Sequence, residues 1–188
     1  MKKKKILVHS CCAPCSTYVY KALILDGFNI TGFFYNPNIH GVQEYKLRLK
    51  SMVHWGKIIK KRIIIPEYDI KDYFEALLKY EKGHHRAIEY DKKRRCQVCF
   101  ALRLKRTAQV AKKRNNDFFT TTLLVSPYQD QSLLWQIGSD VGSEVGIDFY
   151  FRDFRKGYLA SRHFARTNSL YQQNYCGCVY SIDEKARE

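Results

Sequence analysis

The stretch Lys4-Lys-Ile-Leu-Val-His-Ser-Cys-Cys-Ala-Pro-Cys15 decides the fold of this chain. Its apolar run, Ile6-Leu-Val8, is of the kind that forms a buried strand. Pro14 follows at a position where a helix tolerates a missing backbone N–H, and Gly27 is placed to end that helix. A buried strand that leads directly into a helix predicts the first strand–helix unit of a parallel sheet.

The same alternation continues along the chain. Further strands are predicted at 28–35, 63–65, 118–124 and 147–151, and further helices at 42–61, 70–80, 96–113, 131–145 and 158–166. This pattern predicts an α/β fold: one Rossmann-like or HUP-like three-layer domain with a mostly parallel five-stranded sheet. We expect it to span residues 1–188, with a basic insertion loop at 82–95 and a C-terminal segment at 170–188 that closes the site. In such folds, ligands bind beyond the carboxyl ends of the strands.

The seven cysteines fall into three clusters. They are Cys11, Cys12 and Cys15, then the C-x-x-C pair Cys96 and Cys99, and then the C-x-C pair Cys176 and Cys178. Cysteines used as small core hydrophobes would be scattered singly. Three clusters far apart in sequence therefore indicate one sulfur-rich site assembled by the fold, at the carboxyl edge of the sheet.

The sequence favours a reducing compartment. The first apolar run is too short for the core of a signal peptide, and no segment approaches the roughly 18 apolar residues that a membrane span needs. We therefore expect a cytoplasmic protein that has no membrane partner. There, paired cysteines more often indicate metal binding or catalysis than structural disulfide bonds. A chain of 188 residues also builds a core without such bonds.

Spacing by itself leaves the sulfur chemistry open, because thiolates suit zinc and iron–sulfur clusters alike. Cys12-Ala-Pro-Cys15 at a helix start is typical of a thioredoxin-like thiol exchanger, since a helix N-terminus lowers the pKa of a thiol. That interpretation leaves the other five cysteines unused. The remaining alternative is a non-catalytic binding module with a structural zinc. Colour separates the two metals: an anaerobic sample is brown with a cluster and colourless with zinc.

The charge of the chain points to a polyanionic partner. It has 33 Lys and Arg against 18 Asp and Glu, a formal net charge of +15, and such an excess favours nucleic acid. Lys92, Lys93, Arg94 and Arg95 stand directly before Cys96. We expect these four cations to form part of a nucleic-acid-binding surface, and a solvated helix face is the alternative.

Six motifs resemble, in order and spacing, the QueH type of epoxyqueuosine reductase. They are His9-Ser-Cys-Cys-Ala-Pro-Cys15, Tyr35-Asn-Pro-Asn-Ile-His40, Arg95-Cys-Gln-Val-Cys-Phe100, Phe119-Thr-Thr-Thr-Leu123, Arg152-Asp-Phe-Arg155 and Leu170-Tyr-Gln-Gln-Asn-Tyr-Cys-Gly-Cys178. The resemblance covers nearly the whole chain. Two departures are Gly41, where a proline is expected, and the basic run 91–94, where glycines are expected; both are predicted to lie in loops.

The resemblance implies an oxidoreductase that acts on tRNA, and the surface at Lys92, Lys93, Arg94 and Arg95 is then expected to bind tRNA. The alternative is a non-catalytic tRNA-binding module with a structural zinc. The family reduces epoxyqueuosine at the wobble position to queuosine, the last step of queuosine biosynthesis, and the electron donor stays unidentified. The resemblance also implies a [4Fe–4S] cluster. Its expected ligands are Cys11, Cys12, Cys96 and Cys99.

Four more residues are implicated beside this cluster. The resemblance implies that Cys176 and Cys178 are redox-active, as a disulfide bond or as ligands of an adjacent metal such as a mononuclear iron. Cys15 is a further candidate ligand, with packing or reactivity as alternatives. Asp153 follows the last predicted strand, and we expect it to ligate a metal or supply a proton. The alternative for Asp153 is a salt bridge to a neighbouring arginine.

Overall fold

The computed structural model describes residues 3–84 and 91–186. Its centre is a five-stranded, fully parallel sheet in the order β3-β2-β1-β4-β5. The strands are β1 Lys5–His9, β2 Asn29–Phe33, β3 Ile63–Ile64, β4 Phe118–Thr121 and β5 Asp148–Phe149. The α/β class and the five parallel strands predicted from the sequence are confirmed.

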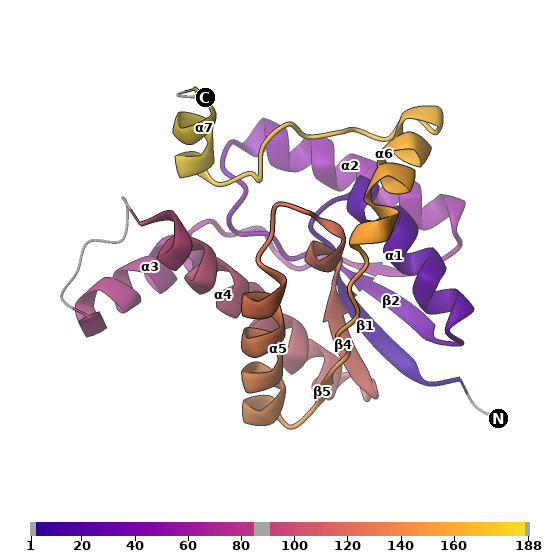
Figure 1. Ribbon diagram of the computed structural model, residues 1–188, viewed down its shortest axis with the longest axis horizontal. Helices are drawn as coiled ribbons and strands as arrows, with labels where there is room; N and C mark the ends of the chain where they lie inside the picture. Colours follow the sequence, from indigo (N-terminus) through magenta and orange to yellow (C-terminus); the bar gives the residue numbers. More distant parts are fainter. Residues whose placement is uncertain (1–2, 85–90, 187–188) are drawn as a thin grey trace.

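Helices cover both faces of the sheet (Figure 1). They are α1 Ala13–Leu25, α2 Val42–Ile58, α3 Lys71–His84, α4 Lys92–Lys113, α5 Gln131–Val145, α6 Tyr158–Thr167 and α7 Val179–Ala186, with short 3-10 turns η1 Thr122–Val125 and η2 Arg155–Gly157. Helices α1, α2 and α6 lie on one side, and α4 and α5 lie on the other. Among the described helices, none is long and apolar enough to cross a membrane.

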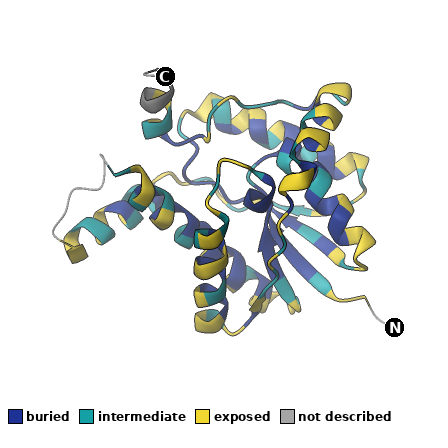
Figure 2. Cartoon of the chain, viewed as in Figure 1, coloured by how far each residue is buried: buried dark blue, intermediate teal, exposed yellow. Residues whose placement is uncertain are grey.

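The central strand β1 organises the core. Ile6, Leu7 and Val8 are fully buried, because a parallel strand between two helical layers contacts apolar side chains on both faces. Leu23 of α1 and Leu104 of α4 are likewise fully buried, and all five belong to one hydrophobic cluster. Figure 2 shows this burial running along the sheet and the inward helix faces, whereas the outward faces are exposed.

The fourth strand is shorter than predicted. It ends at Thr121, whose side-chain oxygen accepts a hydrogen bond from the backbone N–H of Leu123 at 3.1 Å. This side-chain cap turns the chain into η1, because threonine can replace a strand partner with a local bond. The turn places Thr122 beside the end of β1, where its Oγ1 accepts from the backbone N–H of Cys11 at 3.1 Å.

The predicted basic loop at 82–95 is wrong where the structure describes it. Helix α3 continues through Gly83 to His84, and α4 already begins at Lys92. Asp91 caps α4 by accepting from the backbone N–H of Arg94 at 3.0 Å, as aspartate commonly does at helix starts. The density of charge suggested a loop, but lysine and arginine are good helix formers. Residues 85–90 lie outside the described part of the chain.

The strand order places a switch point between β1 and β4. From β1 the chain proceeds to β2 and β3 on one side, and later to β4 and β5 on the other. The carboxyl ends of β1 and β4 are neighbours, since His9 pairs in register with Thr121. Ligands of open parallel sheets bind at such a point, and here the sequence continues into the first cysteine cluster.

Candidate metal centre

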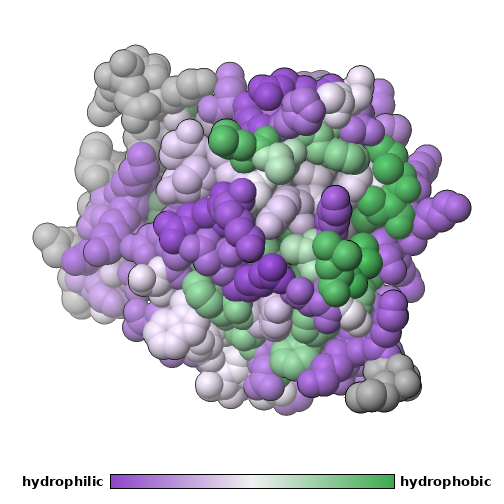
Figure 3. All heavy atoms as spheres, turned by 45° about the vertical axis from the view of Figure 1, so that its right-hand side comes forward, coloured by the Kyte–Doolittle hydropathy of each residue, from purple (hydrophilic) through white to green (hydrophobic). Residues whose placement is uncertain are grey.

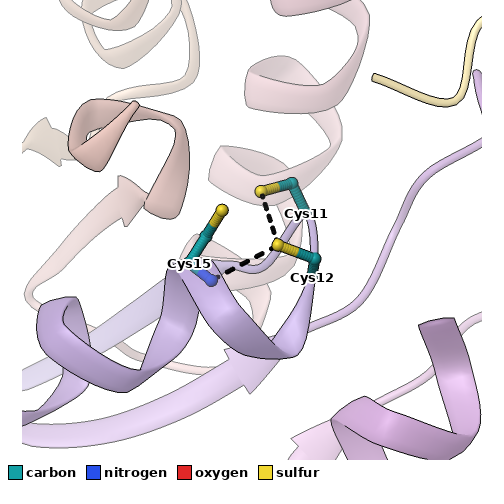
Figure 4. Close-up of side chains that lie close together, drawn as sticks. All are labelled: Cys11, Cys12 and Cys15. Atoms are coloured by element: carbon teal, nitrogen blue, oxygen red, sulfur yellow. Dashed lines mark hydrogen bonds between the residues drawn. The ribbon is translucent and has the colours of Figure 1, made fainter. Parts of the chain in front are cut away.

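Cys11, Cys12 and Cys15 form a compact sulfur triad at this switch point. Their three Sγ atoms all lie within 4.8 Å of one another, and those of Cys11 and Cys12 are 3.8 Å apart (Figure 4). Cys11 follows β1, and Cys15 belongs to the first turn of α1. With three sulfur donors this close together, the triad could hold a metal ion.

Helix geometry explains why the triad forms. Cys12 is the N-cap of α1: its backbone is extended, and its Sγ accepts from the backbone N–H of Cys15 at 3.3 Å. Pro14 occupies the first turn, where its missing N–H costs nothing. The N-terminal end of a helix favours negative charge, so the helix adds to the stability of a thiolate in the triad.

The three sulfurs share negative charge unequally. Hydrogen bonds from Cys12 and Cys15, and then from Thr122 Oγ1 at 3.3 Å, hold the pKa of Cys11 well below its ordinary value although burial opposes the shift. Burial, and then the bond to Cys11, raises the pKa of Cys12, while bonds to both neighbours raise that of Cys15. Cys11 is therefore the sulfur of the triad most inclined to be a thiolate.

The C-x-x-C pair lies in the second and third turns of α4, because this helix begins at Lys92, about one turn before the predicted start at Cys96. Cys99 is buried, and burial raises its pKa to about 11, with Arg103 opposing the shift. Cys96 is half-buried against the hydrophobic core. Because residues three apart share a face of a helix, both sulfurs and Arg103 belong to one side of α4.

The C-x-C turn is held to the body of the protein by its backbone. Arg48 Nη1 of α2 donates to the carbonyl oxygen of Cys176 at 2.9 Å. The N–H of His40 donates to the carbonyl of Gly177 at 2.8 Å, and His40 Nδ1 accepts from the N–H of Val179 at 2.8 Å. The turn is therefore anchored to α2 and to the segment that follows β2.

This anchoring brings the C-x-C pair beside the C-x-x-C pair. Cys178 and Cys99 are buried in one small cluster with Tyr73 of α3, and the Tyr73 hydroxyl lies 3.1 Å from Cys178 Sγ. Cys176 is exposed, with its Sγ 3.1 Å from Ser181 Oγ. A hydrogen bond from Cys178 lowers the pKa of Cys176 to about 5. That the segment at 170–188 closes the site stays a prediction, and the described contact is the packing of Cys178 beside Cys99.

The charge of one buried cation, Arg103, interacts with cysteines of all three clusters. Arg103 is only 5% exposed, and its Nε donates to the carbonyl oxygen of Cys99 at 3.3 Å. Burial by itself would lower the pKa of Arg103, but four cysteines raise it: Cys99, Cys11, Cys176 and Cys96. Sequence reasoning did not identify this arginine as a site residue. A cation four residues after a cysteine, on the apolar side of a helix, is the signal that could have identified it.

Asp153 is engaged by an arginine. Both of its carboxylate oxygens accept from Arg155, with Nε distances of 3.0 and 2.9 Å, and these bonds lower its pKa. Arg152 pairs instead with Asp26. The geometry therefore matches the salt-bridge alternative, on an exposed turn, and gives no support to a metal ligand at this carboxylate.

The four cations before Cys96 do not form one surface. Lys92 and Lys93 are exposed on the first turn of α4, and Arg94 pairs with the aspartate that caps this helix. Arg95 is 5% exposed, and its guanidinium carbon lies 4.7 Å from the ring centroid of Tyr180. The two lysines therefore face solvent, whereas Arg95 packs the C-terminal helix against α4. A role of the four cations in binding tRNA stays a prediction.

Comparison with known proteins gives one consistent family. A family model described as epoxyqueuosine reductase QueH matches residues 6–184. Relatives named Epoxyqueuosine reductase QueH include one from Dehalococcoides mccartyi, 34% identical over 96% of this chain and 94% of its own. Those from Thermotoga maritima and Acinetobacter baylyi are 32% and 33% identical and cover 96% and 97% of this chain, and 91% and 83% of their own.

Similarity to one solved structure supports the fold alone. It is the crystal structure of a predicted subunit of tRNA methyltransferase from Methanocaldococcus jannaschii, with a TM-score of 0.55 and 15% sequence identity. The similarity covers 87% of this chain and 74% of that one. At such low identity the likeness concerns the path of the backbone, which the two chains share over most of their length.

Proposed function

This chain belongs to the epoxyqueuosine reductase QueH family, and from that premise we propose that it reduces epoxyqueuosine in tRNA to queuosine. The observation that supports the chemistry is the assembly of three cysteine clusters around Arg103. In the reaction both C–O bonds of the epoxide break and a C=C bond forms. Two electrons and two protons convert the released oxygen to water.

We propose that Cys11, Cys12, Cys96 and Cys99 hold a [4Fe–4S] cluster. All four donors are sulfur, which suits iron–sulfur chemistry, and the first two are already close together at a helix start. When bound, such a cluster supplies single electrons at the site. Cys15 completes the triad, and we propose it as a ligand of the same centre or of an adjacent mononuclear metal.

The C-x-C pair is suited to supply electrons and protons together. Oxidation of the Cys176 and Cys178 thiols to a disulfide releases two electrons and two protons, the number that the epoxide consumes. We propose this pair as the redox-active dithiol, which an external electron donor must then reduce. The bond to Cys176, and then burial, raises the pKa of Cys178, whereas the Tyr73 hydroxyl, 3.1 Å from Cys178 Sγ, opposes that shift and is placed to stabilise the thiolate when this sulfur gives up its proton.

The tRNA requires a basic surface beside the sulfur site. Lys92 and Lys93 stand at the N-terminal end of α4, where cations are unfavourable next to the positive end of the helix dipole. Phosphate groups would remove that cost. We propose that these two lysines contact the backbone of the anticodon loop, whose bases are unpaired and cost little to extrude into a pocket.

Anaerobic purification with iron and sulfide analysis tests the proposal. We expect a brown protein that converts epoxyqueuosine to queuosine in tRNA, as measured by mass spectrometry of the digested nucleosides. Alanine at any of the four proposed ligands should lower iron content and abolish conversion. A colourless protein that retains zinc and shows no conversion would identify the structural-zinc alternative. Full iron occupancy in Cys96→Ala would remove that residue from the ligand set.

A further inference from the structure

An exposed aromatic pair stands at the carboxyl edge of the sheet. Tyr128 is 80% exposed on the turn that follows η1. Its ring meets that of Tyr158 edge to face, with ring centroids 6.0 Å apart and an interplanar angle of 85°. The turn is shaped locally, since the Tyr128 N–H donates to Ser126 Oγ at 3.3 Å. Little of the Tyr128 ring is used in folding, so it is available to a ligand.

The pair borders the cysteine triad from two directions. Tyr158 begins α6, which packs across α1 (Figure 1). The start of α6 packs closely on α1, since a Cβ atom added at Gly157 would lie 2.1 Å from Cδ1 of Tyr18. Tyr18 lies one turn after Cys15 on α1. Tyr128 follows η1, whose first residue binds Cys11. The rings therefore lie at the edge where the sheet presents its sulfurs.

Cations accompany the two rings. Arg162 is four residues after Tyr158 on α6 and so shares its side of the helix. Lys156 is exposed on the preceding turn, whereas its neighbour Arg155 is occupied by Asp153. Figure 3, with this side of the molecule turned forward, shows hydrophilic side chains surrounding small apolar patches rather than one large apolar face. Such a surface suits a charged ligand better than an apolar protein partner.

We infer that Tyr128 and Tyr158 form a stacking platform for an unpaired base of the RNA loop, with Lys156 and Arg162 on the phosphates of its backbone. Aromatic rings between cations are how proteins bind single-stranded nucleic acid, because every base has a π-face. The inference rests on the proposed function for the identity of the RNA. It adds a second contact surface, on the other side of the sulfur site from Lys92 and Lys93.

The test measures binding apart from catalysis. The probe is an anticodon stem–loop RNA with a terminal fluorophore, titrated with the full-length protein. Tyr128→Ala should weaken binding by at least about five-fold, because stacking contributes about 1–3 kcal/mol per base. Tyr128→Trp should restore affinity. Lys156→Ala should reduce the magnitude of the salt dependence by about 0.7 in the logarithmic slope, the release expected for one single-strand phosphate contact.

Leu25→Ala is the matched control. Leu25 is 76% exposed at the far end of α1, and its removal should leave affinity unchanged. Wild-type affinity of Tyr128→Ala, or equal losses in Tyr128→Ala and Tyr128→Trp, would overturn the platform. Binding of a fully paired duplex as tightly as the loop would also overturn it. If the wild-type protein makes no queuosine but Tyr128→Ala still weakens binding of the loop, the proposed function is contradicted and the stacking platform is not.

Discussion

Arg48 on α2 donates a 2.9 Å hydrogen bond to the carbonyl oxygen of Cys176, 128 residues away in sequence. The arginine side chain is only 2% exposed, and its Nε lies 2.7 Å from Oε1 of Glu44. The other carboxylate oxygen of Glu44 accepts from the Tyr171 hydroxyl at 2.5 Å. One buried ion pair thus fixes both the approach to the C-x-C turn and the turn itself. The position of the proposed redox pair, Cys176 and Cys178, therefore depends on contacts made by Arg48.

Arg48→Met should release the C-x-C turn. Loss of the guanidinium leaves the partly buried Glu44 carboxylate with the Tyr171 hydroxyl as its donor, at a cost of about 1–3 kcal/mol in the free energy of unfolding. We expect a lower melting temperature and faster alkylation of Cys178 by iodoacetamide, followed by peptide mass spectrometry. Lys46→Met, at an exposed position on the same helix, is the control. Equal alkylation rates at Cys178 in the two variants would show that the turn is held by its other contacts.

The serine variants Cys176→Ser and Cys178→Ser should separate electron supply from cluster binding. Four other cysteines are sufficient ligands for the proposed cluster, so both variants should keep most of its visible absorbance. Conversion of epoxyqueuosine should fall to background, because a single thiol cannot form the disulfide. Absorbance and nucleoside analysis on the same anaerobic sample measure both. Normal conversion in both variants would make the pair structural.

The sequence predicted the fold well where local signals agreed. The apolar run 6–8, the proline at position 14 and the helix 131–145 each carried a clear signal, and the structure matches them. The start of α4 could not be inferred in the same way. Its first turn is strongly basic, and only the capping bond of Asp91 shows that the helix begins there. Composition predicts a solvated segment but does not distinguish helix from loop.

The candidate site was predictable as a set of residues but not as an arrangement. Clustering of cysteines indicated a common site, yet nothing in the spacing placed Cys15 within 4.8 Å of both Cys11 and Cys12. Arg103 was not identified, because a buried cation is recognisable only when the sulfurs around it are in place. Asp153 looked available by its position after a strand, and only coordinates reveal its bond to Arg155.

His9 should make the protein sensitive to acid. It is fully buried, with Nδ1 2.9 Å from Thr121 Oγ1 and Nε2 3.1 Å from the carbonyl oxygen of Tyr35. Burial, and then the charge of Arg103, lowers its pKa from 6.5 to about 3. Between about pH 6.5 and pH 3, His9 therefore binds a proton in the unfolded chain but not in the folded chain. The contribution to stability is complete above about pH 6.5 and is lost as pH falls toward 3, by about 2 kcal/mol between pH 7 and pH 5.

Urea denaturation at several pH values measures this loss. His9→Gln keeps a side-chain N–H for the Tyr35 carbonyl but does not titrate, so its free energy of unfolding should fall less steeply between pH 7 and pH 5. His54→Gln, at an exposed position on α2, should retain the wild-type slope. A His9→Gln slope equal to that of the wild type would mean that His9 accepts its proton within the fold.

The basic run before Cys96 should divide into two functions. Lys92 and Lys93 are exposed, so their joint replacement by alanine should weaken tRNA binding and flatten the logarithmic salt dependence by about 1.4, or about 0.7 for each single-strand phosphate contact. The cluster spectrum should not change, and the melting temperature should not fall, because the two lysines are unfavourable at the positive end of the helix dipole. Arg95→Ala should do the reverse, because its guanidinium packs on Tyr180: the C-terminal helix loosens and thermal stability falls, while the salt slope stays near that of the wild type. Filter binding at a series of salt concentrations, with thermal denaturation of the same samples, measures both effects. A wild-type salt slope in the lysine double variant would show that Lys92 and Lys93 are only solvated and do not contact phosphates. A flattened slope in Arg95→Ala would show that Arg95 contacts the RNA.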